Sequence, residues 1–243
     1  MSLPAPLASS GDTETDSLEI EFHLDRKRPV ADQVYEALKA AIVSVRLLPG
    51  TSISENRMCR HFGVSRTPVR SAIVRLADEG LIDVYPQQGS FVAPIRLADV
   101  YDRHFIRKHL ELAVLAEVAK RWTAAKSAEA RAIVATQVAA IEVGDPALFH
   151  ERDEALHAAF AVFAEREGIW PTIQMAKARM SRLHRLFGPP ERLPVVVEEH
   201  LSVLDALDAG DAALAHQRLE YHLDKIFETF DPMPEAYRPY LAD

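Results

Sequence analysis

The run from Gly63 to Arg70 constrains the fold of this chain most, because it combines the signals that end one helix and begin the next. Gly63 suits the C-terminal end of a helix, and Ser65 suits the N-cap of the following one. Pro68 then falls in a first turn, where its missing N–H costs no hydrogen bond. Beyond it, apolar residues recur at helical spacing and predict a buried side: Val69, Ala72, Ile73 and Leu76.

The other side of this predicted helix carries cationic side chains. Arg66 and Arg70 are four residues apart and therefore share one face, with Thr67 close by. Arginine forks match the O6 and N7 atoms of guanine, and a helix N-terminus favours phosphate, so the run is typical of a helix that reads the major groove of DNA. The alternative is a solvated arginine face on an ordinary amphipathic helix, and the flanking sequence decides between the two.

Two further helices are predicted upstream. The first is indicated by an apolar stripe that stops at the turn signal Leu48–Gly50; the stripe consists of Val30, Val34, Leu38, Ile42 and Val45. Ser54 is the predicted N-cap of the second helix, over residues 55–62. Two short helices joined by a turn that contains glycine make a helix-turn-helix.

A hairpin is predicted downstream, where Glu79–Gly80 ends the reading helix. Residues 81–85 and 90–93 are rich in strand-forming side chains and flank a turn at 86–89. Gly89 at the tip would let the backbone approach another molecule closely. Residues 24–96 are therefore predicted to form a winged helix-turn-helix, and this context favours DNA contact over a merely solvated arginine face.

Residues 30–95 resemble the DNA-binding domain of the GntR family of bacterial transcription regulators. The matching motifs span the domain: Gln33-Val34-Tyr35, Pro49-Gly50, the run Gly63–Arg70, Arg75-Leu76, Glu79-Gly80-Leu81 and Gly89. The resemblance implies DNA contacts from the reading helix, the start of the helix before it and the wing: Ser65, Arg66, Thr67, Arg70, Asn56, Arg57, Gln88 and Gly89. Asn56, Ser71 and Gln88 depart from the family pattern, so the resemblance does not imply a particular operator sequence.

The charge distribution agrees with a DNA-binding N-terminal part. The whole chain holds 28 Lys and Arg against 36 Asp and Glu, which gives a net charge of −8. Residues 24–96 nevertheless hold 11 basic and 7 acidic side chains, a net charge of +4. Residues 97–243 hold 17 basic and 24 acidic ones. Only the predicted winged domain carries the positive charge that phosphate contact requires.

The remaining features indicate a cytoplasmic protein. Cys59 is the single cysteine and cannot form a disulfide within the chain, as expected in a reducing compartment. No apolar stretch reaches membrane-spanning length, so no membrane partner is expected. Residues 1–23 carry five acids and no Lys or Arg and predict a disordered acidic tail. Residues 231–243 are a C-terminal extension to which the sequence assigns no role.

Residues 97–230 predict an all-α bundle of six to seven helices, so the expected fold class is mainly α. Every periodic segment in this region has helical spacing, and the breaks contain Gly, Pro or Ser. Six helices can be placed from the pattern: 97–122, 127–143, 145–166, 170–187, 191–209 and 211–230.

Four polar residues lie on the apolar stripes of three of these helices. Asp153 and His157 are one turn apart in the third helix, His200 is in the fifth and His222 in the sixth. An unpaired buried carboxylate is costly, and a divalent cation bound by neutral imidazoles would compensate it. The alternative is a set of buried, hydrogen-bonded histidines without a metal.

Residues 97–228 resemble the FCD-type effector domain of the FadR subfamily of GntR regulators. The motifs that carry the resemblance are Arg107-Lys-His-Leu-Glu111, Asp153-Glu-Ala-Leu-His157, Glu199-His200, Gly210-Asp211 and His222. The resemblance implies that a divalent metal ion, for which Zn, Ni and Mn are candidates, is bound by Asp153, His157, His200 and His222. It also implies that Arg107 contacts an acidic effector, the alternative being an ion pair of Arg107 with Glu111 or Glu117.

The sequence thus predicts a homodimeric transcription regulator, more specifically a repressor, that reads a palindromic operator in double-stranded DNA. A small organic acid bound at the metal site would control operator binding. One alternative is a metalloenzyme fused to a DNA-binding domain, although no general base has helical support beside the four ligands. Another is a metal-free regulator that senses an acyl thioester, which would have no need of four inward metal ligands.

Overall fold

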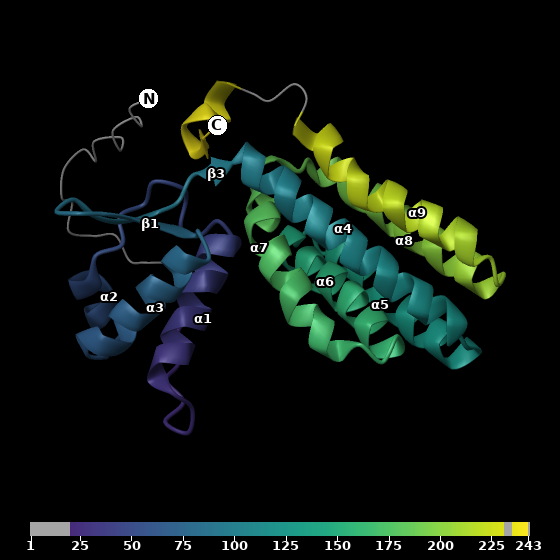
Figure 1. Cartoon of the computed structure of the whole chain (residues 1–243), viewed down its shortest axis with the longest axis horizontal. Helices are drawn as coiled ribbons and strands as arrows, with labels where there is room; N and C mark the ends of the chain where they lie inside the picture. Colours follow the sequence, from purple (N-terminus) through teal and green to yellow (C-terminus); the bar gives the residue numbers. More distant parts are fainter. Residues whose placement is uncertain (1–19, 231–234, 243) are drawn as a thin grey trace. The chain divides into compact units, whose positions relative to one another are not determined.

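The computed structural model describes residues 20–230 and 235–242, and it shows two compact units (Figure 1). Residues 20–98 with 235–242 form the N-terminal unit, and residues 99–230 form the helical unit. Most of the described residues are helical, which confirms the predicted mainly α fold class. Among the described helices, none combines the length and the apolar character that crossing a membrane requires.

The helices α1 (Val30–Val43), α2 (Glu55–Phe62) and α3 (Arg66–Asp78) make up the helix-turn-helix. Ser54 caps α2, since its hydroxyl accepts a hydrogen bond from the Arg57 backbone N–H at 3.4 Å. Gly63 ends α2 with a φ of 64°, a left-handed conformation that glycine adopts without strain. The apolar stripes of the three helices meet in one buried cluster that includes Leu38, Ile42, Met58, Phe62, Val69, Ile73 and Leu76.

Two details of the predicted helices are wrong. The sequence extends the first stripe to Val45, but α1 ends at Val43, and Val45 has a φ of 56°, which is outside the helical range. The turn is held by the backbone N–H of Leu47, which donates to the carbonyl of Ala41 at 3.0 Å. Ser65 is the N-cap residue of α3 as predicted, yet its exposed hydroxyl makes no capping bond.

The wing consists of β1 (Ile82–Tyr85) and β2 (Gly89–Val92), which pair antiparallel with Tyr85 opposite Gly89. The ends of the hairpin near the core are buried, whereas its turn, residues 86–88, is exposed. Gly89 has a φ of 115°, which side chains other than hydrogen rarely allow, so the position requires glycine. The predicted hairpin is therefore confirmed, with strand limits shifted by one residue.

The N-terminal boundary of this unit lies earlier than the sequence predicts. Residues 1–19 of the expected tail are outside the described residues, but Ile20 is only 4% exposed and belongs to the buried cluster. Its carbonyl lies 2.7 Å from His61 Nε2, and the rings of Phe22 and Phe62 have centroids 4.7 Å apart. Two apolar side chains in an otherwise acidic segment thus pack on α2, because burying them removes apolar surface from water.

Part of the C-terminal extension also belongs to the N-terminal unit. A short 3₁₀ helix, η4 (Glu235–Tyr240), leads into β4 (Leu241–Ala242). This strand pairs in parallel with β3 (Ile95–Arg96), the segment directly before the helical unit, with Ile95 opposite Leu241. The sequence assigns no role to residues 231–243; the described part of them adds a strand to the start of the interdomain connection.

The helical unit contains six α-helices over the described residues, as the sequence predicts. Their bounds are α4 (Leu97–Lys120), α5 (Ala124–Glu142), α6 (Pro146–Phe163), α7 (Trp170–Phe187), α8 (Leu193–Asp208) and α9 (Ala212–Asp224). The 3₁₀ helices η1 (Glu167–Ile169) and η2 (Pro190–Arg192) precede α7 and α8. The last helix is shorter than predicted, because its continuation to Phe230 is a 3₁₀ helix, η3 (Lys225–Phe230).

Packing of these helices produces one core. α5 packs against α6 and α8, and α8 packs against α9. Figure 1 shows α8 and α9 side by side. α4 contacts α9 through His104 and Lys108, which both bond to Asp224. The core includes Leu115, Val118, Phe149, Leu156, Phe160, Leu204 and Leu219. Because α6, α8 and α9 face this core, polar residues on their inner stripes are brought together in its interior.

The N-cap of α9 provides a test of how the helical unit is stabilised. Asp211 Oδ1 accepts a hydrogen bond from the Leu214 backbone N–H at 2.9 Å. We expect Asp211→Ala to lower the free energy of unfolding of this unit by about 1 kcal/mol, whereas Asp211→Asn, which still caps, should lower it far less. Chemical denaturation followed by circular dichroism measures the difference, and equal losses in both variants would contradict the capping role.

Candidate functional site

The start of α3 presents an exposed polar face. Arg66, Thr67 and Arg70 are all exposed, whereas Val69 on the opposite side is fully buried. The Arg70 side chain is 77% exposed, and its closest ionic contact is Glu55 at 3.9 Å, too long for a hydrogen bond. Two guanidinium groups one turn apart at a helix N-terminus are therefore available to bases and phosphates.

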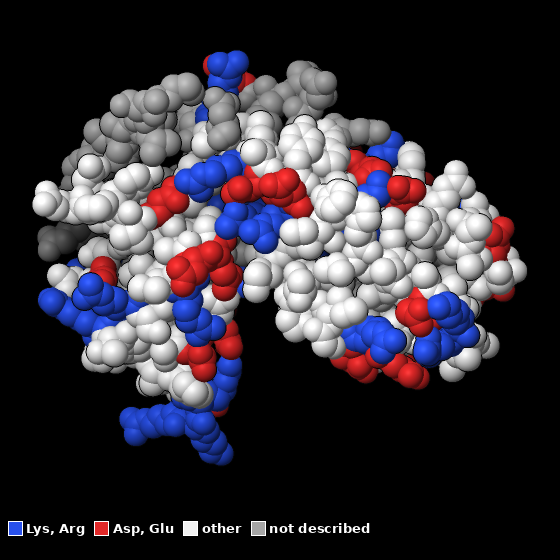
Figure 2. Space-filling model, viewed as in Figure 1, with Lys and Arg blue, Asp and Glu red and all other residues white. Residues whose placement is uncertain are grey.

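The other predicted DNA-contacting residues lie in α2 and in the wing of the same N-terminal unit. Asn56 is exposed and Arg57 half-buried in the first turn of α2, which lies beside α3 because Glu55 in the same turn is 3.9 Å from Arg70. Gln88 and Gly89 are exposed at the wing turn. In Figure 2, Lys and Arg side chains gather over the part of the N-terminal unit that carries α2 and the start of α1. The structure thus leaves every predicted contact residue accessible to some degree.

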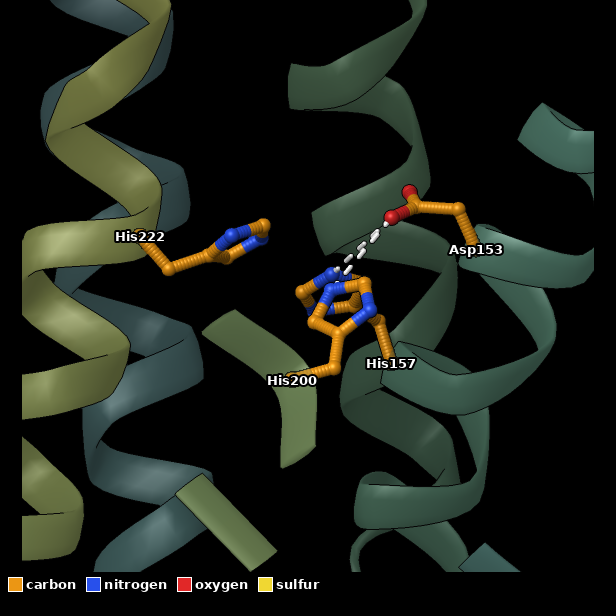
Figure 3. A group of neighbouring side chains, drawn as sticks. All are labelled: Asp153, His157, His200 and His222. Atoms are coloured by element: carbon orange, nitrogen blue, oxygen red, sulfur yellow. Dashed lines mark ion pairs between the residues drawn. The ribbon is translucent and has the colours of Figure 1, made fainter. Parts of the chain in front are cut away.

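The second predicted site lies inside the helical unit, where four side chains converge (Figure 3). Asp153 and His157 come from α6, His200 from α8 and His222 from α9. One potential ligand atom from each lies within 4.8 Å of all the others. Asp153 Oδ1 is 3.5 Å from His200 Nε2 and 3.8 Å from His157 Nε2. The structure therefore assembles the four residues that the sequence singled out.

Each histidine of this group is oriented by a hydrogen bond on its other ring nitrogen. His157 Nδ1 contacts Glu111 Oε2, His200 Nδ1 lies 3.0 Å from Gln137 Oε1, and His222 Nδ1 lies 2.8 Å from Glu199 Oε2. All three partners are acceptor oxygens, so each Nδ1 carries a proton, and in the neutral form of each ring the lone pair is on Nε2. Carboxylate or amide support of this kind is characteristic of histidines that bind a metal through Nε2.

The inward nitrogens of His157 and His200 are buried and have no hydrogen-bond partner among the described residues. A buried acceptor without a partner is costly, and a cation would satisfy both lone pairs at once. Burial lowers the pKa values of both histidines, so the rings stay neutral. Burial alone would raise the pKa of Asp153, but Lys177 and the histidines outweigh it and hold this pKa well below its usual range. One carboxylate and three imidazoles are a donor set that fits a divalent metal ion.

Arg107 supports this group and also borders a cavity. Its Nε donates to Glu111 Oε1 at 2.6 Å, and Glu111 in turn holds His157. The pair with Glu111 is the alternative that the sequence analysis names; the other named partner, Glu117, instead pairs with Lys120 and Arg121. The Nε bond is the only hydrogen bond of Arg107 among the described residues, so its terminal nitrogens can still reach a ligand.

The cavity next to the four residues has a volume of about 250 Å³. Asp153 and His222 form part of its wall, so a metal bound there would be reachable from the cavity. Its cationic wall residues are Arg107, Lys177, Arg185, Arg192 and Lys225, against the acids Asp153 and Glu154. A space with this excess of positive charge, beside a potential metal site, favours an anionic ligand.

Several of these wall residues were missed by the sequence analysis. Lys177 could have been found, since it is flanked at helical spacing by Ile173 and Met180 on the buried side of α7. His150 and His184 also line the cavity, and burial lowers the pKa of His184 to about 3. Arg192 precedes α8 in the 3₁₀ helix η2 and carries no periodic signal.

Comparison with known proteins identifies both parts of the chain. Residues 30–92 match the family described as "Bacterial regulatory proteins, gntR family", and residues 102–225 match the "FCD domain". The HTH-type transcriptional repressor RspR of Escherichia coli K12 is 33% identical over 214 residues, which cover 86% of this chain and 92% of RspR. The chain belongs to the GntR family. It is a DNA-binding transcription regulator with a C-terminal FCD domain.

Other proteins are similar to this chain along most of their length. A regulator from Streptomyces ambofaciens is 32% identical over 209 residues, covering 86% of this chain and 87% of the relative. The solved structure of Escherichia coli McbR/YncC superposes with a TM-score of 0.74 at 22% identity, covering 85% of this chain and 100% of that one. RspR and the Streptomyces ambofaciens protein are named as transcription regulators, and the chain is accordingly not the metalloenzyme considered as an alternative.

The histidine group leads to a prediction on metal content. The purified protein should hold about one divalent ion per chain, and His222→Ala should lower both this content and the melting temperature, because the ion links α6, α8 and α9. His216→Ala is the matched control, since His216 lies exposed on the same helix. Elemental analysis and thermal unfolding before and after chelation provide the measurements. A melting temperature that neither chelator nor added Zn or Ni changes would contradict the prediction.

The exposed arginines of α3 lead to a second prediction. Arg66→Ala and Arg70→Ala should each weaken specific operator binding by about 1–3 kcal/mol, because each removes a potential bidentate contact with guanine. Lys120→Ala, at an exposed position of the helical unit, should leave operator affinity unchanged. Fluorescence anisotropy with an operator fragment measures the effect at fixed salt. Wild-type affinity in both arginine variants would refute the assignment of α3 as the reading helix.

Proposed function

We propose that this GntR-family regulator is a repressor whose operator binding is released by a small carboxylate held at a metal site in its FCD domain. The observation that carries the proposal is the group of three inward Nε2 atoms and Asp153 at the wall of a cationic cavity. Repression is supported by the names of two relatives, the repressor RspR and a probable D-xylose utilization operon repressor from Paenarthrobacter nicotinovorans, 26% identical over 194 residues.

The metal would be held by Asp153 Oδ1 or Oδ2 together with the Nε2 atoms of His157, His200 and His222. Zn, Ni and Mn all accept such a nitrogen and oxygen donor set. A divalent ion there supplies positive charge and a coordination position for a ligand oxygen. The chain's own contribution is orientation, since Glu111, Gln137 and Glu199 fix the three rings.

The cavity supplies the rest of the recognition. Its volume of about 250 Å³ suits a molecule of a few carbon atoms. Arg107 holds Glu111 through Nε, which leaves its two terminal nitrogens to pair with a carboxylate in the planar geometry that guanidinium favours. The metal and Arg107 would therefore contact the same anionic ligand from two positions on the cavity wall.

The proposal includes a homodimer on a palindromic operator, because one wing and one reading helix cover a single half-site. The outer face of α4 supports dimer formation. Tyr101 and Phe105, one turn apart, are 62% and 64% exposed, and Ile106 beside them is 38% exposed. Such an apolar face is typical of a surface that packs against a second copy. The two DNA-binding domains of the dimer could take up different arrangements. The effector would act by binding the dimer more tightly in one of these arrangements than in the other.

The proposal is tested by titrating the operator complex with organic acids. For the metal-loaded protein, we expect at least one small carboxylate to release the DNA, and Arg107→Ala to raise the required concentration at least about tenfold through loss of a charge-assisted contact. Operator affinity without acid should stay the same, because Arg107 lies in the FCD domain. Lys120→Ala, on the same helix but exposed, serves as the control. An Arg107→Ala response at the wild-type concentration would mean that Arg107 only supports Glu111.

A further inference from the structure

Lys177 is a buried cation that the fold itself leaves without a hydrogen bond. It lies on α7, is 5% exposed, and its Nζ atom has no hydrogen-bond partner among the described residues. The nearest carboxylate oxygen is Asp153 Oδ2 at 3.6 Å, and the Trp170 ring lies 5.8 Å from Nζ. An ammonium group buried in this way is strongly unfavourable unless something supplies the missing interactions.

Asp153 does not supply them when a metal is present. Its carboxylate is the one acid in the group of four potential ligands, and its Oδ1 already faces His157 and His200. One negative charge shared with a divalent cation cannot also neutralise an ammonium group. The metal and Lys177 together therefore leave two positive charges uncompensated in the same wall.

Two other cations of the cavity wall, in contrast to Lys177, form hydrogen bonds with acids. Arg107 pairs with Glu111 at 2.6 Å. Arg192 places one terminal nitrogen 2.8 and 3.1 Å from the two oxygens of Glu199. Acids outside the cavity wall neutralise these two cations, and Arg185 and Lys225 are only half-buried. Among the described wall residues, Lys177 is therefore the cation that is buried and lacks a hydrogen bond to an acid.

We propose, on the basis of the effector site inferred above, that Lys177 anchors the effector directly and that the effector is an acid with two carboxylates. One carboxylate contacts the metal position and Arg107, and the other forms the hydrogen bonds that Lys177 lacks. A dicarboxylate neutralises the two excess charges, whereas a monocarboxylate leaves one of them buried. The volume of about 250 Å³ accommodates a dicarboxylate of a few carbon atoms.

The competing role for Lys177 is a structural ion pair with Asp153, and the two roles predict opposite effects of its removal. If Lys177 binds the effector and is unpaired without it, Lys177→Met should maintain or raise the melting temperature of the metal-loaded, acid-free protein, because a buried unpaired charge is removed. Metal affinity should be maintained or rise as well, since a repelling cation next to the ion is lost. If Lys177 instead stays paired with Asp153 in the metal-loaded protein, both quantities should fall.

The experiment measures thermal shifts of the full-length, metal-loaded protein with acetate and lactate as monocarboxylates and with malonate, succinate and malate as dicarboxylates. In the wild type, at least one dicarboxylate should act at a concentration about tenfold lower than either monocarboxylate, as expected for one additional charge-assisted contact. Lys177→Met should lose this preference, and Lys177→Arg, which keeps the charge, should retain part of it. Lys120→Met, at an exposed position, should behave as the wild type.

The outcomes separate the two proposals. A wild-type protein that no acid stabilises or releases from DNA would overturn the effector site and the role of Lys177 with it. A wild-type response to acids that Lys177→Met reproduces at the same concentrations would leave the effector site standing and refute the anchor. A wild-type protein that prefers monocarboxylates would refute the two-carboxylate class. A fall in melting temperature and metal affinity in the acid-free Lys177→Met protein would assign Lys177 to Asp153.

Discussion

The hydrogen bonds on the outer nitrogens of three histidines are the interaction on which the helical unit depends. Glu111 on α4, Gln137 on α5 and Glu199 on α8 each hold one ring by Nδ1, so the three Nε2 atoms face Asp153. A ring that turned over would place its N–H toward the site and remove a lone pair. Five helices thus contribute either a ligand or its support, and the same polar network that could hold an ion also fixes the packing of the core.

The inward residues could be predicted from the sequence because helical spacing determines which face a side chain occupies. Asp153 and His157 are four residues apart, and both follow the apolar stripe of α6. The supporting residues could not be predicted in the same way. Gln137 and Glu199 meet their histidines only through the packing of α5, α8 and α9, which a periodic pattern does not specify. Lys177 lies between these cases, because its buried position could be predicted but its lack of a partner depends on the fold.

Local chain reversals account for most of the remaining differences between the predicted elements and those of the structure. Val45 continues the spacing of α1, yet the turn after Val43 requires a left-handed residue there, and the bond from Leu47 to Ala41 sets that turn. Periodicity also carries no information on strand pairing between distant segments. Leu241 and Ala242 form too short an apolar segment to predict a strand, and their pairing with β3 is a property of the folded chain alone.

The pairing of β3 with β4 makes the helical unit an insertion within the N-terminal unit. The chain leaves that unit at Arg96 and re-enters it with the segment that ends in Leu241 and Ala242. Separating the DNA-binding domain from the FCD domain would mean cutting the chain after Arg96. The resulting fragment lacks one strand of a two-stranded sheet. Ile95, 3% exposed in the whole protein, would lose the residue opposite it. An independent reader would need the last strand restored, either fused after Arg96 or added as a separate peptide.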